Sequence, residues 1–521
     1  MKKHIFHIAI IVILMSFVSQ SCKQKENYRA NADINKTFDS TLVAPFFVQY
    51  PLLKKYEKDL VAVYRNYDFS HIWFDEKGLV EYGNSLYSKV RDLDDEGIST
   101  SFPYQTKIDY IFAHESDKAL NATDAELLLT SLYLFYVEKV YKGIDNKTTT
   151  NLGWLLPRKK VSYAGLLDSF ISDKKTNDDD SLILFSQYYK LRDVLKLYRG
   201  IEDKGGWKPI ELDPELKSYK PDDSAKAIQQ IRERLFATGD IAQNNGSNQY
   251  DPELVKAVKK YQARNGFKPT SLIRPEHIKD MNIPVSERIK TLVVNMERCR
   301  WISPEFFNAK EYIYVNIPSY DMKFIRDGET VFDSPVVVGD SATKTVIFGG
   351  KMSYIVFSPY WNLPKSIIEK EVEPGMKKNK SYLKLHDMEW NNGQVRQKPG
   401  KNNSLGLVKF MFPNSNDIYF HDTPAKSAFN RENRAISHGC VRVAKAKDLA
   451  LTILTDDETW TPEKINAAMH AGKESICRLK NKIPVQIEYF TAWVDENGEI
   501  NFYKDIYERD KRLALLLFYK D

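Results

Sequence analysis

The stretch from Ile418 to Val443 reads IYFHDTPAKSAFNRENRAISHGCVRV and decides the fold of the C-terminal part of the chain. It places two histidines, His421 and His438, and one cysteine, Cys440, among β-prone residues. On a β-strand Arg442 would share a face with Cys440 and add positive charge there. A free thiol has a pKa of about 8.5 and needs a neighbouring imidazole to become nucleophilic. The stretch therefore predicts a β-rich domain equipped for acyl transfer.

Other interpretations of these residues have to be weighed. Cysteine is among the most buried residue types, so a lone thiol is usually structural. His421, His438 and Cys440 could instead bind zinc, but no fourth ligand stands out in the sequence. His438 could be structural even where the site is real. Gly439 permits close backbone packing, as donors aimed at an oxyanion require, and this favours the catalytic interpretation.

The motif Ser437-His438-Gly439-Cys440-Val441-Arg442 resembles the signature of the L,D-transpeptidase (YkuD-type) catalytic domain. His421-Asp422-Thr423-Pro424, whose histidine is 440 − 421 = 19 residues before the cysteine, matches the second half of that signature. Four further runs fit the family: Ser358–Pro364, Pro399–Gly406, Tyr489–Trp493 and Asp505–Tyr507. With the helical half, they resemble the long periplasmic subtype, which carries a peptidoglycan-binding domain.

The resemblance implies that Cys440 is the nucleophile and His421 the general base. Cys440 would attack the L-centre residue at position three of a tetrapeptide stem and expel the terminal D-Ala. An amine of a neighbouring stem would resolve the thioester and give a 3→3 cross-link. The family also implies acylation by carbapenems, and it implies no cofactor and no metal.

Supporting roles are implied for the residues around this pair. The backbone amides around His438, Gly439 and Cys440 would form an oxyanion hole. Ser437 and the Tyr419 hydroxyl would support it, and Arg442 would contact the substrate. Arg442 would orient the cysteine loop or a substrate carboxylate. Trp361 is either a wall of the substrate cleft or a core aromatic, and the sequence leaves both open.

Two alternatives to this enzyme remain. One is a catalytically inactive wall-binding lipoprotein, against which the intact His421 and Cys440 pair argues. The other is a thiol hydrolase acting on stem peptides, either on this fold with water as acceptor or as an amidase or endopeptidase of another fold. Enzymes of the latter kind place the cysteine at a helix N-terminus and before its histidine, which is the reverse of the order here.

From Glu311 onward the hydrophobic period changes from helical to alternating. Arg326-Asp327-Gly328-Glu329 and Glu496-Asn497-Gly498-Glu499 are hairpin signals. We expect a mainly β catalytic domain over 310–521, with a short, lid-like insertion near 366–400. The family commonly has Thr-Pro at Lys344-Thr345-Val346, a departure expected to affect a loop and not the chemistry.

The N-terminal half is predicted to be helical. We expect a scaffold domain over 41–223, with helices near 124–141 and 184–198, the first preceded by capping residues in Asn121-Ala122-Thr123-Asp124. Residues 224–283 resemble a three-helix peptidoglycan-binding domain in IRERLFATGD and YDPELVKAVKKYQARNGF. Pro269-Thr270-Ser271 replaces its usual Asp-Gly, which bears on glycan affinity rather than on fold. A linker helix is expected over 284–309.

Residues 1–22 have the pattern of a signal peptide. Lys2 and Lys3 precede an apolar core from Ile5 to Val18, which is shorter than the roughly 20 residues of a spanning helix. Cys22 then ends a relaxed lipobox and would carry a lipid, with 23–40 as a polar tether. The alternative is an uncleaved anchor. Either way we expect an exported protein at the periplasmic face of a bacterial membrane.

Composition limits the remaining possibilities. The chain has 76 basic and 70 acidic residues, a balance without the clustered basic face of a nucleic-acid-binding protein. Cys299 and Cys477 are expected to be core thiols, with a disulfide between them left open. The expected fold class is multidomain α+β: a helical scaffold with a small three-helix unit, followed by a mainly β catalytic domain.

Overall fold

The computed structural model describes residues 37–113, 120–171 and 183–519. The expected signal peptide, Cys22 and most of the expected tether lie outside the described residues. The chain divides into two compact units, the first formed by Met1–Leu93, Thr100–Lys139 and Val161–Lys175 and the second by the remainder. Within the described ranges no helix has both the length and the apolar character needed to cross a membrane.

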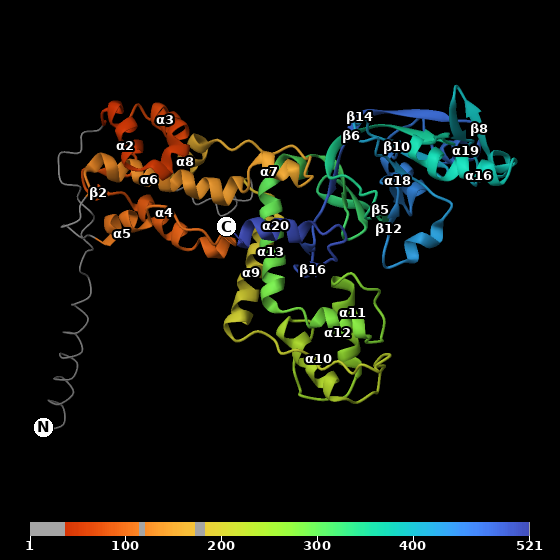
Figure 1. The fold of residues 1–521 in the computed structure, drawn as a ribbon, viewed down its shortest axis with the longest axis horizontal. Helices are drawn as coiled ribbons and strands as arrows, with labels where there is room; N and C mark the ends of the chain where they lie inside the picture. The colour runs from red at the N-terminus through yellow and green to blue at the C-terminus, as the bar shows by residue number, and fades with distance from the viewer. Residues whose placement is uncertain (1–36, 114–119, 172–182, 520–521) are drawn as a thin grey trace, which may run out of the picture. The chain divides into compact units, whose positions relative to one another are not determined.

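The first unit is helical (Figure 1). Its elements are 3-10 turns Ser40–Leu42 and Pro51–Tyr56, α2 (Val43–Gln49), α3 (Glu57–Asn66), α4 (Glu81–Arg91), α5 (Gln105–Ala113), α6 (Ala122–Val137) and α8 (Tyr163–Ile171), with the short hairpin β1 (Phe74–Asp75) and β2 (Gly78–Leu79). The Asn121 side chain caps α6 by accepting from the Asp124 amide at 2.7 Å, which confirms that predicted cap.

Helix α6 is the centre of the first unit. Thirteen of its sixteen residues are buried, so it is enclosed on all sides rather than amphipathic. Burial includes Glu126, whose carboxylate accepts from the Tyr64 hydroxyl at 2.8 Å and from the amides of Ile72 at 2.7 Å and Trp73 at 3.1 Å. These bonds offset the desolvation of the carboxylate and tie α3 and the following loop to α6.

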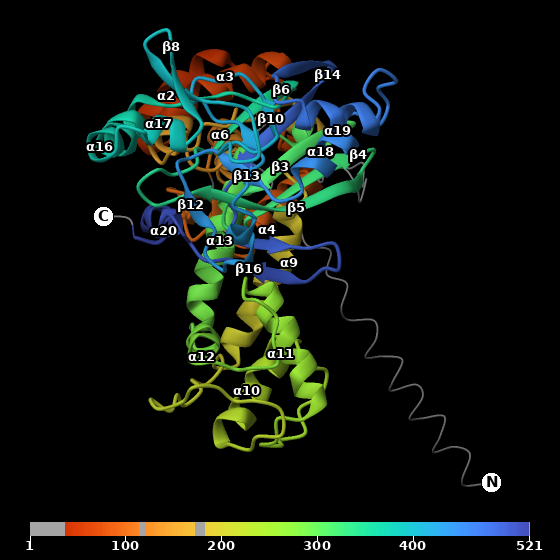
Figure 2. The ribbon, with the colours of Figure 1, turned by 90° about the vertical axis from the view of Figure 1, so that its right-hand side faces the viewer.

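In the second unit, α9 (Gln187–Asp203) lies alongside α13 (Val285–Trp301) (Figures 1 and 2). Thirteen of the seventeen residues of α13 are buried, and its apolar side chains share one core with the β-sheet. The segment expected as a linker helix is therefore a core element. Likewise α9, expected within a scaffold domain ending at residue 223, belongs to the second unit. Sequence periodicity predicted both helices but not what they pack against.

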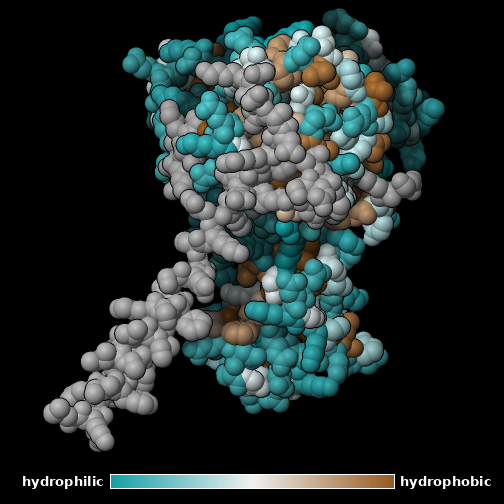
Figure 3. Space-filling model, turned by 90° about the vertical axis from the view of Figure 1, so that its left-hand side faces the viewer, coloured by the Kyte–Doolittle hydropathy of each residue, from teal (hydrophilic) through white to brown (hydrophobic). Residues whose placement is uncertain are grey.

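The predicted three-helix unit consists of α10 (Lys226–Ala237), α11 (Pro252–Arg264) and α12 (Pro275–Met281). It has a core of its own, with Ile231, Leu235 and Val258 among its members. Asp251 caps α11 by accepting from the Leu254 amide at 2.9 Å. The side of this unit visible in Figure 3 is mostly hydrophilic, as expected for helices whose apolar stripes face inward.

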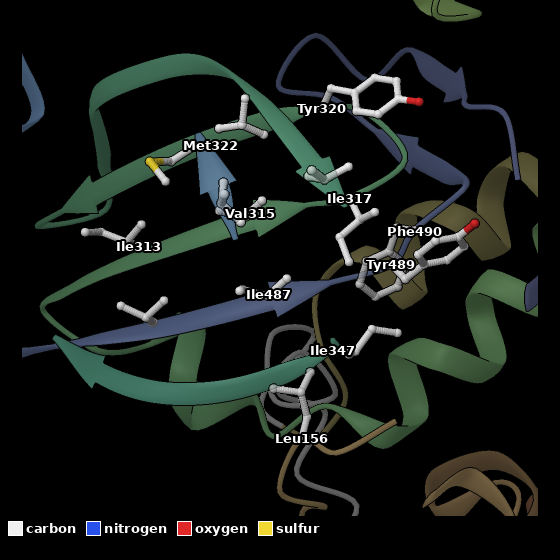
Figure 4. Packing of buried hydrophobic residues seen from close by; sticks show 14 of the residues in the cluster. Leu156, Ile313, Val315, Ile317, Tyr320, Met322, Ile347, Ile487, Tyr489 and Phe490 are labelled. Atoms are coloured by element: carbon white, nitrogen blue, oxygen red, sulfur yellow. The ribbon is translucent and has the colours of Figure 1, made fainter. Parts of the chain in front are cut away.

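The mainly β part is built on a nine-stranded sheet in the order β12-β5-β13-β11-β10-β6-β14-β3-β4. Its strands are β3 (Glu311–Asn316), β4 (Asp321–Arg326), β5 (Glu329–Gly339), β6 (Phe348–Phe357), β10 (Val408–Met411), β11 (Phe420–His421), β12 (Ala435–Ser437), β13 (Val441–Val443) and β14 (Ser475–Glu488). Because β5 also pairs with β4, the sheet closes on itself. Figure 4 shows Ile313, Val315, Met322 and Ile487 packed together on its inner side.

Helices and a hairpin flank the closed sheet. They are α7 (Asn146–Asn151), α14 (Pro304–Phe307), α18 (Ala446–Ile453), α19 (Pro462–His470), α20 (Arg509–Phe518), and β15 (Ala492–Val494) paired with β16 (Ile500–Phe502). Both predicted hairpins are confirmed. In the β4–β5 turn Asp327 and Gly328 have φ of 52° and 84°, the backbone that a two-residue Asp-Gly hairpin requires.

The insertion is a small layer of its own. It contains a three-stranded sheet of β7 (Trp361–Asn362), β9 (Gln394–Gln397) and β8 (Met388–Asn391), with α15 (Lys365–Ile367), a π-helical turn Ile368–Val372, α16 (Glu373–Lys378) and α17 (Tyr382–Leu385). Leu363, Ile367, Val372 and Val395 form its core. It therefore begins at Trp361, a few residues earlier than the expected 366. The predicted α+β fold class, helical first and mainly β afterwards, is confirmed.

Candidate active site

Strands β11 and β13 bring the predicted nucleophile and base to one face of the sheet. They are parallel, with Phe420 opposite Val441 and His421 opposite Arg442. Phe420 and Val441 are buried in the core, so the alternate residues Cys440, Arg442 and His421 point to the outer face. Cys440 comes directly before β13, two residues before the partner of His421. Here the cysteine leads into a strand, unlike in thiol enzymes that hold it at a helix N-terminus.

The backbone fixes which nitrogen of His421 is available. Its Nδ1 lies 2.5 Å from the carbonyl oxygen of Asp422. A carbonyl can only accept, so Nδ1 carries the hydrogen and Nε2 keeps the lone pair. Burial, and secondarily the positive charge of Arg442, lower the pKa of His421 to about 4. The ring is therefore neutral at pH 7 and can accept a proton at Nε2.

Cys440 is held as a thiol rather than as a stored thiolate. Burial raises its pKa, while contacts with Tyr419 and the charge of Arg442 act in the opposite direction. Its sulfur lies 3.7 Å from the carbonyl oxygen of Asp417, an acceptor that suits the protonated form. A neutral thiol and a neutral imidazole on one face of a sheet are the groups that general-base nucleophilic attack on a carbonyl requires.

The loop before Cys440 is tied by hydrogen bonds. Gly439, at φ 114°, donates its amide to the Ser437 hydroxyl at 3.2 Å, and that hydroxyl donates to the Cys440 carbonyl at 2.7 Å. The Gly439 amide therefore already has an acceptor within the loop, while the expected oxyanion hole of backbone amides stays a prediction. Ser437 supports the loop by holding its two ends together.

A second set of bonds supports this loop from β5 and from the C-terminal region, and the sequence did not predict it. The Thr345 hydroxyl donates to the Gly439 carbonyl at 2.8 Å and accepts from the Gly339 amide at 2.8 Å. The Tyr507 hydroxyl donates to the Gly339 carbonyl at 2.5 Å and accepts from the Thr345 amide at 3.2 Å. The expectation that the departure at Lys344-Thr345-Val346 affects a loop and not the chemistry stays a prediction, but Thr345 itself bonds to the cysteine loop.

Two cationic side chains share the outer face with His421. Lys409 of β10 is paired in register with His421, as Arg442 is on the other side. Burial lowers the pKa of both cations, and both lower the pKa of His421. The Arg442 Nε is buried and has no hydrogen-bond partner among the described residues. A buried donor of this kind is suited to an acceptor oxygen of a ligand. The alternation of apolar and polar residues in Val408–Met411 could have indicated from the sequence that Lys409 lies on the outer face of a strand.

The insertion contacts this face at separate points. His438 is exposed, and its Nε2 lies 3.4 Å from Glu371 Oε1 of the insertion. The Lys409 ammonium donates to the Tyr360 carbonyl at 3.4 Å. Trp361 is half-buried, packs on the insertion core and interacts with the Tyr419 side chain. Trp361 is thus both a packing aromatic and a neighbour of the site.

Two of the sequence runs that resemble the family, 358–364 and 399–406, contact each other. The Asn403 amide group donates to the Pro359 carbonyl at 3.1 Å, which joins the 399–406 run to the 358–364 run. Asp422, next to the base, accepts from the Leu407 amide at 3.0 Å and from Lys426 Nζ at 2.5 Å. Runs that are distant in sequence therefore build one framework around His421 and Cys440.

Metal and disulfide chemistry can be considered at the same residues. Within the described part of the chain no group of three or more His, Cys, Asp or Glu residues could hold a metal ion. His421 and His438 face different partners, so the zinc interpretation gains no support. Cys299, Cys440 and Cys477 are free, and the disulfide left open between Cys299 and Cys477 is not formed.

Comparison with known proteins finds matches to two family models. The model of the L,D-transpeptidase catalytic domain matches residues 310–465, and that of a scaffold domain matches residues 58–195. A putative L,D-transpeptidase of Haemophilus influenzae is 36% identical over 259 residues, which cover 45% of this chain and 52% of that protein. The chain thus spans about half the length of this curated relative.

Solved structures of L,D-transpeptidases are similar at a lower level. One from Mycobacterium smegmatis shares 11% identity over 34% of this chain and 59% of its own, with a TM-score of 0.21. One from Stackebrandtia nassauensis shares 15% identity over 52% of this chain and 94% of its own, also with a TM-score of 0.21. At these TM-scores the structural likeness has no bearing on the site.

Proposed function

We propose that this chain cross-links peptidoglycan stem peptides through a thioester on Cys440. The match of residues 310–465 to the model of the L,D-transpeptidase catalytic domain supports this proposal. The observation that carries the proposal is the parallel pairing of β11 and β13, which puts His421 and Cys440 on one face. On that face Cys440 would be the nucleophile and His421, whose Nδ1 is held by the Asp422 carbonyl, would be the base. Peptidoglycan biogenesis and remodelling would be the process served.

In the first half-reaction the Cys440 sulfur attacks the carbonyl at the third residue of a tetrapeptide stem, and His421 Nε2 takes the thiol proton. The amides of His438 and Cys440 are the donors for the oxyanion. The C–N bond to the terminal D-Ala then breaks, and the imidazolium returns the proton to the leaving amine. The product is a thioester on Cys440 and free D-Ala.

In the second half-reaction an amine of a neighbouring stem attacks the thioester and gives its proton to His421. The C–S bond breaks, the thiol is re-formed, and a 3→3 cross-link results. Arg442, with its unpartnered buried Nε, would bind a substrate carboxylate or carbonyl oxygen. Water as the acceptor would turn the same steps into hydrolysis, which is the alternative outcome on this site.

Export and anchoring complete the proposal. Peptidoglycan lies outside the cytoplasm, and the signal-like residues 1–22 ending in Cys22 provide a route there. We propose a lipoprotein at the periplasmic face of a bacterial membrane, with the three-helix unit as a glycan contact. Cys22→Ala should move the protein from the membrane to the soluble periplasmic fraction, and wild type without lipid would contradict this.

The experiment that tests the activity uses a carbapenem as a strained acyl donor. An activated thiol with its oxyanion donors in place should open the ring and gain the mass of the drug. We expect one adduct on the wild type, none on Cys440→Ala, and poor reaction with classical penicillins. An unmodified wild type at saturating carbapenem would support the inactive wall-binding alternative. Equal adducts on both proteins would show that another nucleophile reacts.

A further inference from the structure

A second concave site lies on the closed sheet away from Cys440. It is a groove of about 610 Å³, within the ordinary range for ligand sites. Its walls come from the start of α9, the end of α14, the outer sides of β3 and β4, and the chain after β15. None of the residues described at Cys440 and His421 lines it. Glu329 and Thr330 at the start of β5 line it, whereas Gly339 at the end of β5 supports the cysteine loop, about 30 Å farther along the strand.

Flat aromatic rings make up much of the groove. The rings of Tyr314 and Trp493 lie nearly parallel, 26° apart, with centroids 5.9 Å from each other. Both side chains are half-buried and line the groove, so part of each remains accessible. Beside them Phe307 stacks on Phe185, with centroids 4.0 Å apart. Such rings offer apolar faces, and the tyrosine and tryptophan also have a polar edge.

The rim of the groove is polar and nearly balanced in charge. Exposed side chains of Ser186, Lys190 and Asn308 stand on one side. On the other side Lys323 forms an ion pair with Glu496 at 3.0 Å. Lys190 and Lys323 face the carboxylates of Glu329, Asp495 and Glu496, so the groove has no excess of positive charge to hold an anionic polymer.

We propose that this groove binds a glycan, a chain of uncharged or weakly charged pyranose sugars. A pyranose ring has an apolar C–H face that packs flat on an aromatic ring and hydroxyls around its edge that hydrogen-bond to polar side chains. Tyr314 and Trp493 supply the platform, and Ser186, Lys190 and Asn308 the edge contacts. This inference rests on the proposed function in one respect: the proposed function is the reason for choosing an amino-sugar glycan as the ligand.

The spacing suggests what this binding does. With the groove and the cysteine loop at opposite ends of β5, one extended polymer can be held at the first while a peptide substituent reaches the second. When the groove holds the glycan polymer, the attached stem peptide stays near Cys440, which raises the effective concentration of the stem peptide there. The groove would therefore raise activity on intact peptidoglycan but not on free stem peptides.

The test uses the full chain with Cys440→Ala, so that no substrate is consumed. The probe is a hexamer of β-1,4-linked N-acetylglucosamine, titrated by calorimetry. We expect Trp493→Ala to weaken one site at least tenfold and Trp493→Phe, which keeps a flat ring, to weaken it less than threefold. Trp390→Ala is the matched control, because Trp390 is 54% exposed on the insertion and outside the groove.

A second variant covers the case in which Trp493→Ala fails to fold. Ser186 is exposed and gives α9 no capping bond, so Ser186→Phe should fill the groove with no change in the melting temperature and remove the same site. If the three-helix unit also binds the sugar, the stoichiometry should fall from two to one. Unchanged affinity and stoichiometry in both variants would overturn the inference, as would a wild type that binds stem peptide but no sugar.

This result can be separated from the activity of Cys440. On the background with Cys440 intact, Trp493→Ala should exchange D-amino acids into free tetrapeptide at the wild-type rate and lose activity only on intact peptidoglycan. Sugar binding that depends on Trp493, without a carbapenem adduct, would leave the groove established and refute the transpeptidase. A carbapenem adduct without sugar binding would support the transpeptidase and refute the groove as a glycan site.

Discussion

Thr345 and Gly439 are joined by a hydrogen bond of 2.8 Å, in which the Thr345 hydroxyl donates to the Gly439 carbonyl. The same hydroxyl accepts from the Gly339 amide, so one side chain connects the end of β5 to the loop that presents Cys440. Neither backbone group would have this partner without it. The position of Cys440 therefore depends on a residue outside the proposed pair of Cys440 and His421.

We predict that Thr345→Val lowers kcat about 10- to 100-fold with little change in KM. The substitution preserves shape but leaves two buried backbone groups unpaired, at a cost of about 1–3 kcal/mol each, and a loosened loop misplaces the thiol. The split between kcat and KM on a stem tetrapeptide is the measurement. Thr345→Ser, which keeps the hydroxyl, should restore most of the rate. An unchanged kcat in the valine variant would show that the cysteine loop keeps its conformation without the Thr345 hydroxyl.

The pH dependence of kcat/KM should have its acid limb near pH 4 instead of near 6.5. Burial and Arg442 hold the pKa of His421 at about 4, so the base stays neutral, and competent, down to that pH and is lost only below it. Arg442→Gln removes a positive charge, which should raise this pKa and move the limb upward. A wild-type limb at pH 6–6.5 would mean that another group is the base.

The two histidines of the motif should differ sharply. His421→Ala removes the base and should reduce the rate 10²- to 10⁴-fold. His438 is exposed and pairs with Glu371 of the insertion, so His438→Ala and Glu371→Ala should each cost less than tenfold, and the double variant no more than either single one. The reverse order, with His438→Ala the more damaging, would exchange the assigned roles.

Much of this arrangement was predictable, and the rest was not, for identifiable reasons. The motif placed Cys440 and His421, and the Asp-Gly and Asn-Gly turns placed both hairpins, because such signals are local. The role of Thr345 depends on a contact between residues 94 positions apart, and no local pattern records it. The burial of α13 was missed for the same reason: its sequence predicts a helix, but only the assembled sheet decides what covers it.

Gly406 should tolerate no side chain. Its φ is 63°, and an added Cβ would lie 2.3 Å from Asp422 Oδ2, in the framework beside His421. Gly406→Ala should therefore lower both the melting temperature and the activity. Gly393→Ala is the matched control, since Gly393 has a φ of 78° and open space around it. It carries the same backbone strain without the clash, so equal effects of the two substitutions would show that the contact with Asp422 is unimportant.

Two buried glutamates provide the last prediction. Glu488 is fully buried, and neither carboxylate oxygen has a hydrogen-bond partner among the described residues. Burial raises its pKa to about 8, above the value of about 4.3 in an unfolded chain. The folded state therefore holds a proton that the unfolded state releases, and the free energy of unfolding should fall as the pH rises from about 4 to about 8.

Glu488→Gln cannot ionise, so it should abolish this fall. The variant should match the wild type near pH 4 and exceed it by several kcal/mol above pH 8, each unit of pKa shift being worth about 1.4 kcal/mol. Glu126→Gln is the contrasting control. Glu126 is equally buried, and burial raises its pKa too, to about 7. In contrast to Glu488, three donors bond its carboxyl group, and an amide nitrogen in place of one oxygen would face some of those donors. Calorimetric unfolding at pH 5 and pH 8 should show Glu488→Gln stabilised at the higher pH and Glu126→Gln destabilised at both. Equal losses in the two variants would mean that Glu488 has a donor after all.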